Sequence, residues 1–123
     1  MKTETILKAP LLIVLSFGAA ACQPLTPDSL GQTPQQSRGL AFAWASCGGC
    51  HSVERVGLSS NADAPPFAQI VNQEGLTQAT LASWLRDAHN YPAEMEFRLE
   101  GSQVDDLVSY MLALRNPNYR PAI

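Results

Sequence analysis

Apolar residues recur at helical spacing in three stretches of the chain. An amphipathic helix places its core-facing residues three or four positions apart, whereas a half-buried strand alternates apolar and polar residues. No stretch shows the alternation typical of strands. The sequence therefore predicts an all-α fold. Its three helical stretches comprise Leu40, Ala43, Trp44 and Cys47; Leu81, Trp84, Leu85 and Ala88; and Val104, Leu107, Val108, Met111 and Leu114.

Residues that start and stop helices flank these stretches. Thr77 precedes the second stretch and is a typical N-cap residue. Ser102 and Asp105 have the spacing of a capping box at the start of the third stretch, and Pro117 follows its end. A shorter helix is expected over residues 66–71, because proline is favourable in the first turn of a helix.

The N-terminal segment has the pattern of an export signal. Lys2 and Lys8 precede an apolar run over residues 9–21. This run is shorter than the about 20 apolar residues that a membrane-spanning helix needs. It has the length of the apolar core of a secretory signal peptide and ends in small residues. The sequence predicts that residues 1–21 form a signal peptide.

The tetrapeptide ending in Cys22 resembles the lipobox of bacterial lipoproteins, in which the cysteine is acylated and becomes the first mature residue. The same residues, Ala19-Ala20-Ala21, also satisfy the ordinary A-x-A cleavage pattern. That alternative leaves Cys22 as an unpaired thiol in a soluble periplasmic protein, and an uncleaved segment is a third alternative. Since lipidation removes an exposed free thiol, we expect Cys22 to hold the protein at the periplasmic side of a bacterial membrane.

The segment after Cys22 is rich in proline and glutamine. Residues 23–38 contain three prolines, four glutamines and few large apolar side chains, a composition typical of a linker. We therefore expect a lipidated cysteine and flexible linker over residues 22–38 and one domain over residues 39–123. A core of that size is marginal without a disulfide, a metal or a cofactor.

Charge excludes one broad class of partner. The 123-residue chain has a formal net charge of -3, whereas a nucleic-acid-binding protein is expected to carry clustered basic residues. Without residues 1–21, six arginines, ten acidic residues and no lysine remain, so the charge becomes -4. We expect no nucleic-acid partner.

Cys47-Gly48-Gly49-Cys50-His51 is a C-x-x-C-H run, the attachment signature of c-type haem. Cysteines three residues apart at a helix end project to nearly the same side, so both thiols can bond to the vinyl groups along one haem edge. His51 can then bind the iron as an axial ligand. The two glycines leave room for a flat macrocycle.

Three other chemistries use the same cysteine spacing. A zinc site needs further ligands, and the second histidine of the chain is His89. A dithiol oxidoreductase needs a βαβ context that the pattern lacks. A plain disulfide between Cys47 and Cys50 is the third. Export, small size and helical class together favour haem attachment.

From Gly39 to about Arg115 the chain resembles a small monohaem cytochrome c. Besides the haem motif, the resemblance includes Pro65, Trp84, Met95 and the last helix, in the order typical of that family. It implies three to four helices wrapped around one covalently bound haem. It also implies Met95 as the sixth iron ligand, although Glu96 follows where the family usually has proline. His89 or an open position are the alternatives.

The resemblance implies two supporting contacts. The Pro65 carbonyl would accept a hydrogen bond from His51, and the Trp84 indole would bond a haem propionate. The residues alone also permit a rigid loop at Pro65 and a core position for Trp84. Met111 lies on the stripe of the last helix and is expected in the core, and Phe42, Phe67 and Phe97 around the haem.

The resulting hypothesis is a non-enzymatic electron carrier with His/Met ligation. Its donor would be a dehydrogenase or quinol-oxidising complex, and its acceptor a terminal oxidase. One alternative is an open-site haem protein that binds small gases or reduces peroxide. Another is a dedicated electron-transfer subunit of a larger oxidoreductase.

Overall fold

Every regular element is a helix in this computed structural model, which describes residues 31–87, 89 and 93–121. The described ranges contain no strand, which confirms the all-α class. The predicted signal peptide, Cys22 and the linker up to residue 30 lie outside them. Within these ranges no helix has both the length and the apolar character needed to cross a bilayer. The helices are α1 (Pro34–Ser46), α2 (Phe67–Val71), α3 (Gln78–Asp87), the 3-10 helix η2 (Ala93–Met95) and α4 (Gly101–Ala113).

Helix α1 begins at Pro34, so the prediction of a linker reaching residue 38 is wrong for residues 34–38. Thr33 Oγ1 accepts a hydrogen bond from the Gln36 amide at 3.2 Å, and Gln36 Oε1 accepts one from the Thr33 amide at 2.9 Å. This capping box pairs two amides that helix starts otherwise leave free, and proline suits the first helical position. A composition typical of linkers thus also serves a capped helix start.

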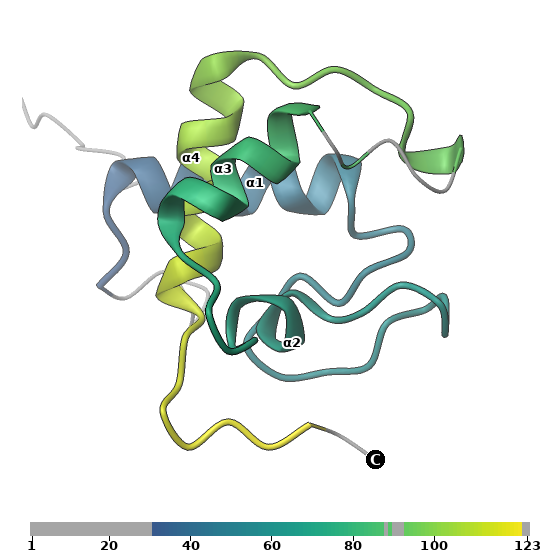
Figure 1. Cartoon of the computed structure of the whole chain (residues 1–123), viewed down its shortest axis with the longest axis vertical. Coiled ribbons are helices and arrows are strands. Elements are labelled where there is room, and N and C mark those ends of the chain that lie inside the picture. The colour runs from purple at the N-terminus through teal and green to yellow at the C-terminus, as the bar shows by residue number, and fades with distance from the viewer. Residues whose placement is uncertain (1–30, 88, 90–92, 122–123) are drawn as a thin grey trace, which may run out of the picture.

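The first and last helices cross closely, and α4 also contacts α2 and α3 (Figure 1). Gly39 permits the approach. A Cβ atom added there would lie 2.1 Å from the Asp106 carbonyl oxygen and 2.7 Å from Tyr110 Cβ. The crossing therefore depends on a residue without a side chain.

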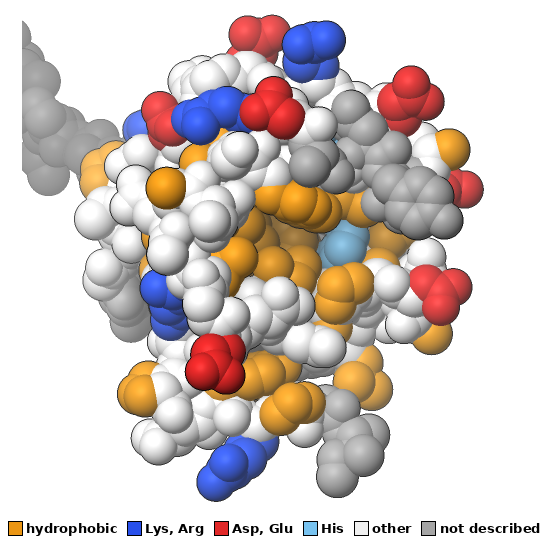
Figure 2. Space-filling view, viewed as in Figure 1, with side chains coloured by type: hydrophobic (Ala, Val, Ile, Leu, Met, Phe, Trp, Pro, Cys, Tyr) orange, Lys and Arg blue, Asp and Glu red, His pale blue; other side chains and the backbone are white. Residues whose placement is uncertain are grey.

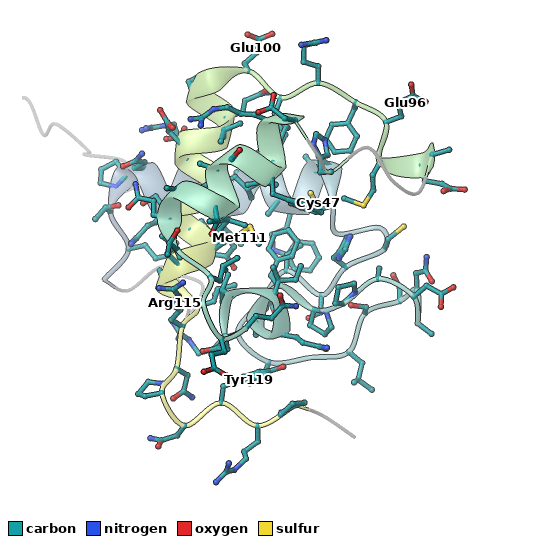
Figure 3. All side chains as sticks on the ribbon, viewed as in Figure 1. Cys47, Glu96, Glu100, Met111, Arg115 and Tyr119 are labelled. Atoms are coloured by element: carbon teal, nitrogen blue, oxygen red, sulfur yellow. The ribbon has the colours of Figure 1, made fainter. Side chains whose placement is uncertain are left out.

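The apolar stripe of the last helix is buried as predicted. Its five residues, Val104, Leu107, Val108, Met111 and Leu114, are at most 4% exposed. Figure 3 shows Met111 among the packed helices. Leu81 and Leu85 of α3 and Ala43 of α1 join the same core.

The two tryptophans lie on the predicted apolar helix faces but are not buried in the core. Trp44 is 52% exposed and Trp84 is 39% exposed. Helical spacing gives the direction of a side chain but not how far the neighbouring helices extend over it. A helical face identified from spacing is therefore not buried along its whole length.

Caps on the later helices follow the predictions in part. Thr77 Oγ1 accepts a hydrogen bond from the Thr80 amide at 3.1 Å, which confirms Thr77 as the cap of α3. The capping box predicted at Ser102 is wrong. Helix α4 starts two residues upstream, where Gln103 Oε1 accepts from the Glu100 amide at 2.8 Å.

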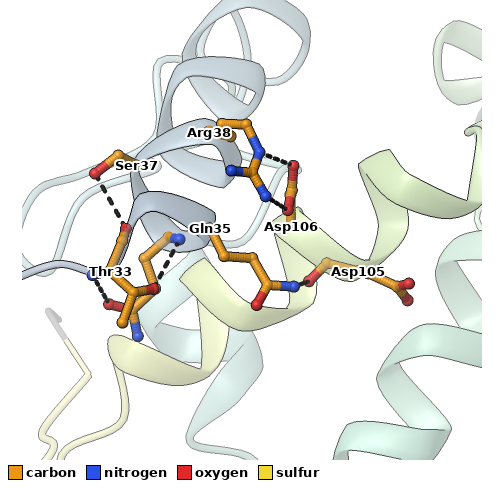
Figure 4. Close-up of polar contacts among 7 residues, drawn as sticks. Thr33, Gln35, Ser37, Arg38, Asp105 and Asp106 are labelled. Atoms are coloured by element: carbon orange, nitrogen blue, oxygen red, sulfur yellow. Dashed lines mark hydrogen bonds and ion pairs between the residues drawn. The ribbon is translucent and has the colours of Figure 1, made fainter.

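An ion pair joins the crossing helices beside Gly39. Arg38 Nε and Nη2 donate to the two carboxylate oxygens of Asp106 at 2.7 and 2.8 Å (Figure 4). The Arg38 hydrogen bond and charge hold the pKa of Asp106 below its ordinary value. Gln35 adds a hydrogen bond to the carbonyl of Asp105 at 3.3 Å.

Arg115, just after α4, ties the C-terminal end to the segment around α2. Its Nε donates to the Val71 carbonyl at 3.0 Å, and its Nη2 donates to the Leu76 carbonyl. The Asn116 amide adds a bond to Asn72 Oδ1 at 2.9 Å. These contacts hold one side of the cavity described below.

Candidate functional site

The cysteine motif forms a tight turn where α1 ends. The amides of Cys50 and His51 both donate to the Cys47 carbonyl, at 3.1 and 2.9 Å. Both cysteines are free thiols; Cys47 is half-buried and Cys50 is exposed. The turn therefore brings two thiols and an imidazole together at one helix end.

Polar loop residues hold this turn in place. Ser60 Oγ donates to the Gly49 carbonyl at 2.7 Å, and the Asn61 amide donates to the Cys50 carbonyl at 3.2 Å. Ser59 Oγ accepts from the Ser52 amide at 3.0 Å. The sequence alone does not single out Ser59 and Ser60, because serine is common in loops.

The ring of His51 is oriented by one hydrogen bond. Its Nδ1 lies 2.8 Å from the Pro65 carbonyl oxygen. Because a carbonyl can only accept, Nδ1 carries a proton, and in the neutral imidazole Nε2 keeps a free lone pair. The ring of Phe67 packs against the imidazole at a tilt, 5.6 Å away between centroids. The contact with Pro65 that the resemblance implies is therefore present.

The two glycines of the motif have different surroundings. A Cβ added to Gly48 would lie 2.8 Å from Cε3 of Trp44, whereas one added to Gly49 would meet nothing within 4 Å. Gly48 is thus needed for the packing of an exposed indole against the turn. The idea that both glycines clear space for a ligand has no support at Gly48.

A cavity of about 620 Å³ opens beside the motif turn. Small-molecule and cofactor sites commonly have volumes of about 300–1,000 Å³. Figure 2 shows hydrophobic side chains gathered around a hollow on the viewed face, with a histidine inside it and acidic side chains around it. Of the residues predicted for the site, Cys50, His51, Pro65, Trp84 and Met95 line this cavity.

A second, smaller cavity of about 30 Å³ lies toward the core. His51, Trp84 and Met95 border both cavities, and Cys47 borders the smaller one. The structure thus gathers all six predicted site residues of the described chain around one region. Phe42, Phe67 and Phe97, which are expected around the haem, line the smaller cavity.

Met95 and Trp84 stand at the cavity wall from different elements. Met95 is the last residue of η2 and is half-buried. Glu96, which follows it, is exposed and points outward (Figure 3). Trp84 projects from α3, and its partial exposure contradicts the alternative of a core position.

His89 is the residue whose environment the sequence did not reveal. It is 1% exposed, and neither ring nitrogen has a hydrogen-bond partner among the described residues. Its ring meets those of Phe97 and Trp84 edge-on, at centroid distances of 5.0 and 6.0 Å. The loop after α3 has no periodic pattern, so burial there could not be read from spacing.

The pKa of the Cys47 thiol helps to judge whether the cysteines could act as a dithiol oxidoreductase or a nucleophile. Burial raises its pKa to about 11, with a smaller contribution from Cys50. Reactive cysteines of dithiol oxidoreductases and nucleophilic enzymes instead need a lowered pKa. The environment of Cys47 therefore does not favour those functions.

Among residues 31–87, 89 and 93–121, no three or more His, Cys, Asp or Glu side chains are grouped so as to hold a metal ion. The candidate site is therefore defined by the cysteine motif turn, the His51 imidazole and the cavity beside them. No protein-family model, curated protein or solved structure matches the chain.

Proposed function

We propose that this protein is a monohaem c-type cytochrome that carries single electrons between redox partners. The observation that carries the proposal is the arrangement of His51 within the C-x-x-C-H turn. Its Nδ1–H is bonded to the Pro65 carbonyl at 2.8 Å, and Nε2 is left free beside the cavity. Metal-binding histidines commonly donate their other ring nitrogen in this way, which fixes the tautomer and the ring orientation.

The residues around the cavity fit a haem. Ile70, Leu76, Leu81 and Trp84 supply apolar contact, and Cys47 and Cys50 supply the two thiols for thioether bonds. A bound haem would contribute an iron that changes oxidation state by one electron. His51 would hold one axial position through Nε2.

Met95 is our candidate for the other axial position. It borders both cavities, as does His51, and its thioether is a soft ligand. A histidine and a methionine together raise the reduction potential and close both faces of the iron. A closed iron site suits electron transfer and disfavours gas binding or peroxide reduction, so we propose that the protein is not itself an enzyme.

The proposed setting follows from the N-terminal sequence. Export by residues 1–21 and lipidation of Cys22 would hold the domain at the periplasmic side of a bacterial membrane. A mature charge of -4 without lysine favours partners with a basic docking surface, and such encounters are slowed by salt. The proposed partners are a donor dehydrogenase or quinol-oxidising complex and an acceptor oxidase.

The proposal is tested by producing the full chain with a cytochrome c maturation system. We expect haem that stays on the chain after denaturation, and loss of that haem in the Cys47→Ser/Cys50→Ser variant. The oxidised protein should show the far-red band of a thioether bound to ferric iron, and Met95→Ala should lose it. Met111→Leu, which alters a buried core methionine, is the matched control and should keep the band.

Two results would contradict the proposal. Absence of covalent haem in the matured chain removes the cytochrome itself. Rapid carbon monoxide binding to the reduced native protein, without the far-red band when oxidised, would instead support the open-site alternative.

A further inference from the structure

His89 is a fully buried imidazole without a polar partner in the described part of the chain. Its exposed fraction is 1%, and both Nδ1 and Nε2 lack hydrogen bonds there. Buried polar side chains nearly always have a partner. A histidine in this state calls for an explanation in terms of what its nitrogens bind.

The cavity beside His89 indicates where a partner for its ring nitrogens could lie. It borders the small cavity together with Cys47, His51 and Met95. Aromatic rings cover two of its edges, Phe97 at 5.0 Å and Trp84 at 6.0 Å between centroids. Neither neighbour can accept a conventional hydrogen bond from the imidazole. The cavity that it shares with the proposed axial residues is therefore where a nitrogen of His89 can find a ligand.

We propose that His89 is a reserve axial ligand, which binds the haem iron opposite His51 whenever the Met95 sulfur leaves that position. This inference rests on the proposed function. In the exchange the iron–sulfur bond breaks and an iron–nitrogen bond forms, while the other imidazole nitrogen keeps its proton and no electron moves. Imidazole is an established iron ligand, and thioether is the softer of the two.

The sequence leaves few other side chains that could replace Met95 on the iron. The chain contains two histidines, His51 and His89, and its two lysines lie at positions 2 and 8. Once the signal peptide is removed, no lysine can replace a lost methionine. A second imidazole on the iron must then come from His89.

The first test compares Met95→Ala with the double variant Met95→Ala/His89→Phe, both as full chains carrying haem. We expect the oxidised single variant to be low-spin by electron paramagnetic resonance and the double variant to be high-spin. If His89 holds the iron in about nine of ten molecules, cyanide binds the single variant about tenfold more weakly than the double variant. A high-spin single variant with the same cyanide affinity as the double variant would overturn the proposal.

A second measurement needs only the single variant, in case the double variant does not fold. Met95→Ala is produced with ¹⁵N-labelled histidine, and pulsed electron paramagnetic resonance reads the nitrogen ligands of the iron. Two coordinated imidazoles support the proposal. One coordinated imidazole overturns it. A wild-type chain without covalent haem would instead overturn the proposed function, so the two failures are distinguishable.

Discussion

The backbone of Gly39 on α1 lies against the backbone carbonyl of Asp106 on α4. The space between them is too small for a methyl group, because a Cβ on Gly39 would come within 2.1 Å of the Asp106 oxygen. Backbone atoms on both sides leave no flexible side chain to move away. The helix that ends in the cysteine motif is therefore held by a contact that no other residue type can make.

We expect Gly39→Ala to lower the free energy of unfolding by about 3 kcal/mol or more, at the upper end of the cost of overpacking. Urea unfolding followed by circular dichroism measures it. Gly101→Ala is the matched control, because a Cβ there would meet nothing within 4 Å. An equal effect of both substitutions would contradict the close crossing.

Asp106→Asn should change the acid sensitivity of the protein. The folded-state pKa of Asp106 lies below its ordinary value because Arg38 donates to it. The contribution of the pair to stability is therefore present above about pH 4, the unfolded value, and is lost as pH falls toward the folded one. We expect the variant to lose less stability than wild type across that interval.

Asp105→Asn is the comparison for this effect. Asp105 is 63% exposed at its side chain and meets Arg86 at 3.3 Å, and such surface pairs contribute little. Urea midpoints at several pH values between 3 and 7 provide the measurement. If the urea midpoints of wild type and Asp106→Asn changed in parallel with pH, the Arg38 contact would not lower the pKa of the Asp106 carboxyl group.

Tyr110→Phe should cost about 1–3 kcal/mol, the range for leaving a buried polar group without its partner. The Tyr110 hydroxyl donates to the Val53 carbonyl at 2.7 Å inside the protein. Thermal unfolding of the variant, with Tyr119→Phe as a comparison outside the buried core, measures the loss. No difference between the two variants would argue against a buried hydrogen bond.

Thr33→Ala should cost about 1 kcal/mol, as expected for removing an N-cap. Thr33→Ser keeps a hydroxyl for the Gln36 amide and should restore most of the loss. Chemical denaturation of the three proteins measures the effect. If residues 33–38 were instead a linker, alanine and serine would both behave as wild type.

If the protein binds haem as we propose, removal of that haem should lower stability markedly, since a group bound by the folded state alone shifts the equilibrium toward folding. The comparison is between the haem-loaded chain and Cys47→Ala/Cys50→Ala produced without haem, by urea midpoint. The apolar cavity wall, including Ile70 and Leu81, would then face water. Equal midpoints would mean that the cavity is not a haem site.

Local pattern predicted the helices better than their ends. The α4 stripe was identified in full because each of its residues contributes to one buried face. The linker was extended five residues into α1, because the proline- and glutamine-rich composition of residues 23–38 was given more weight than the local capping box of Thr33 and Gln36. The cap at Glu100 was missed because serine and aspartate nearby fit the usual capping pattern better.

The candidate site was predictable to the extent that its chemistry is encoded in consecutive residues. Cys47, Cys50 and His51 are recognisable from spacing alone. The pairing of His51 with Pro65 came from the resemblance, and the structure contains it. The burial of His89 could not be predicted, because it depends on how an aperiodic loop packs against Phe97 and Trp84.

The crossing of α1 and α4 has a consequence for chain topology. Nearly all the residues that line the two cavities lie between these helices in sequence, so the crossing closes them into one loop. The entropy cost of closing a loop grows only with the logarithm of its length, by about 0.6 kcal/mol for each doubling. Insertions among the exposed residues 56–58, in the loop between the motif and α2, should therefore cost folding little. The crossing of α1 and α4, in contrast, does not tolerate even one added methyl group at Gly39.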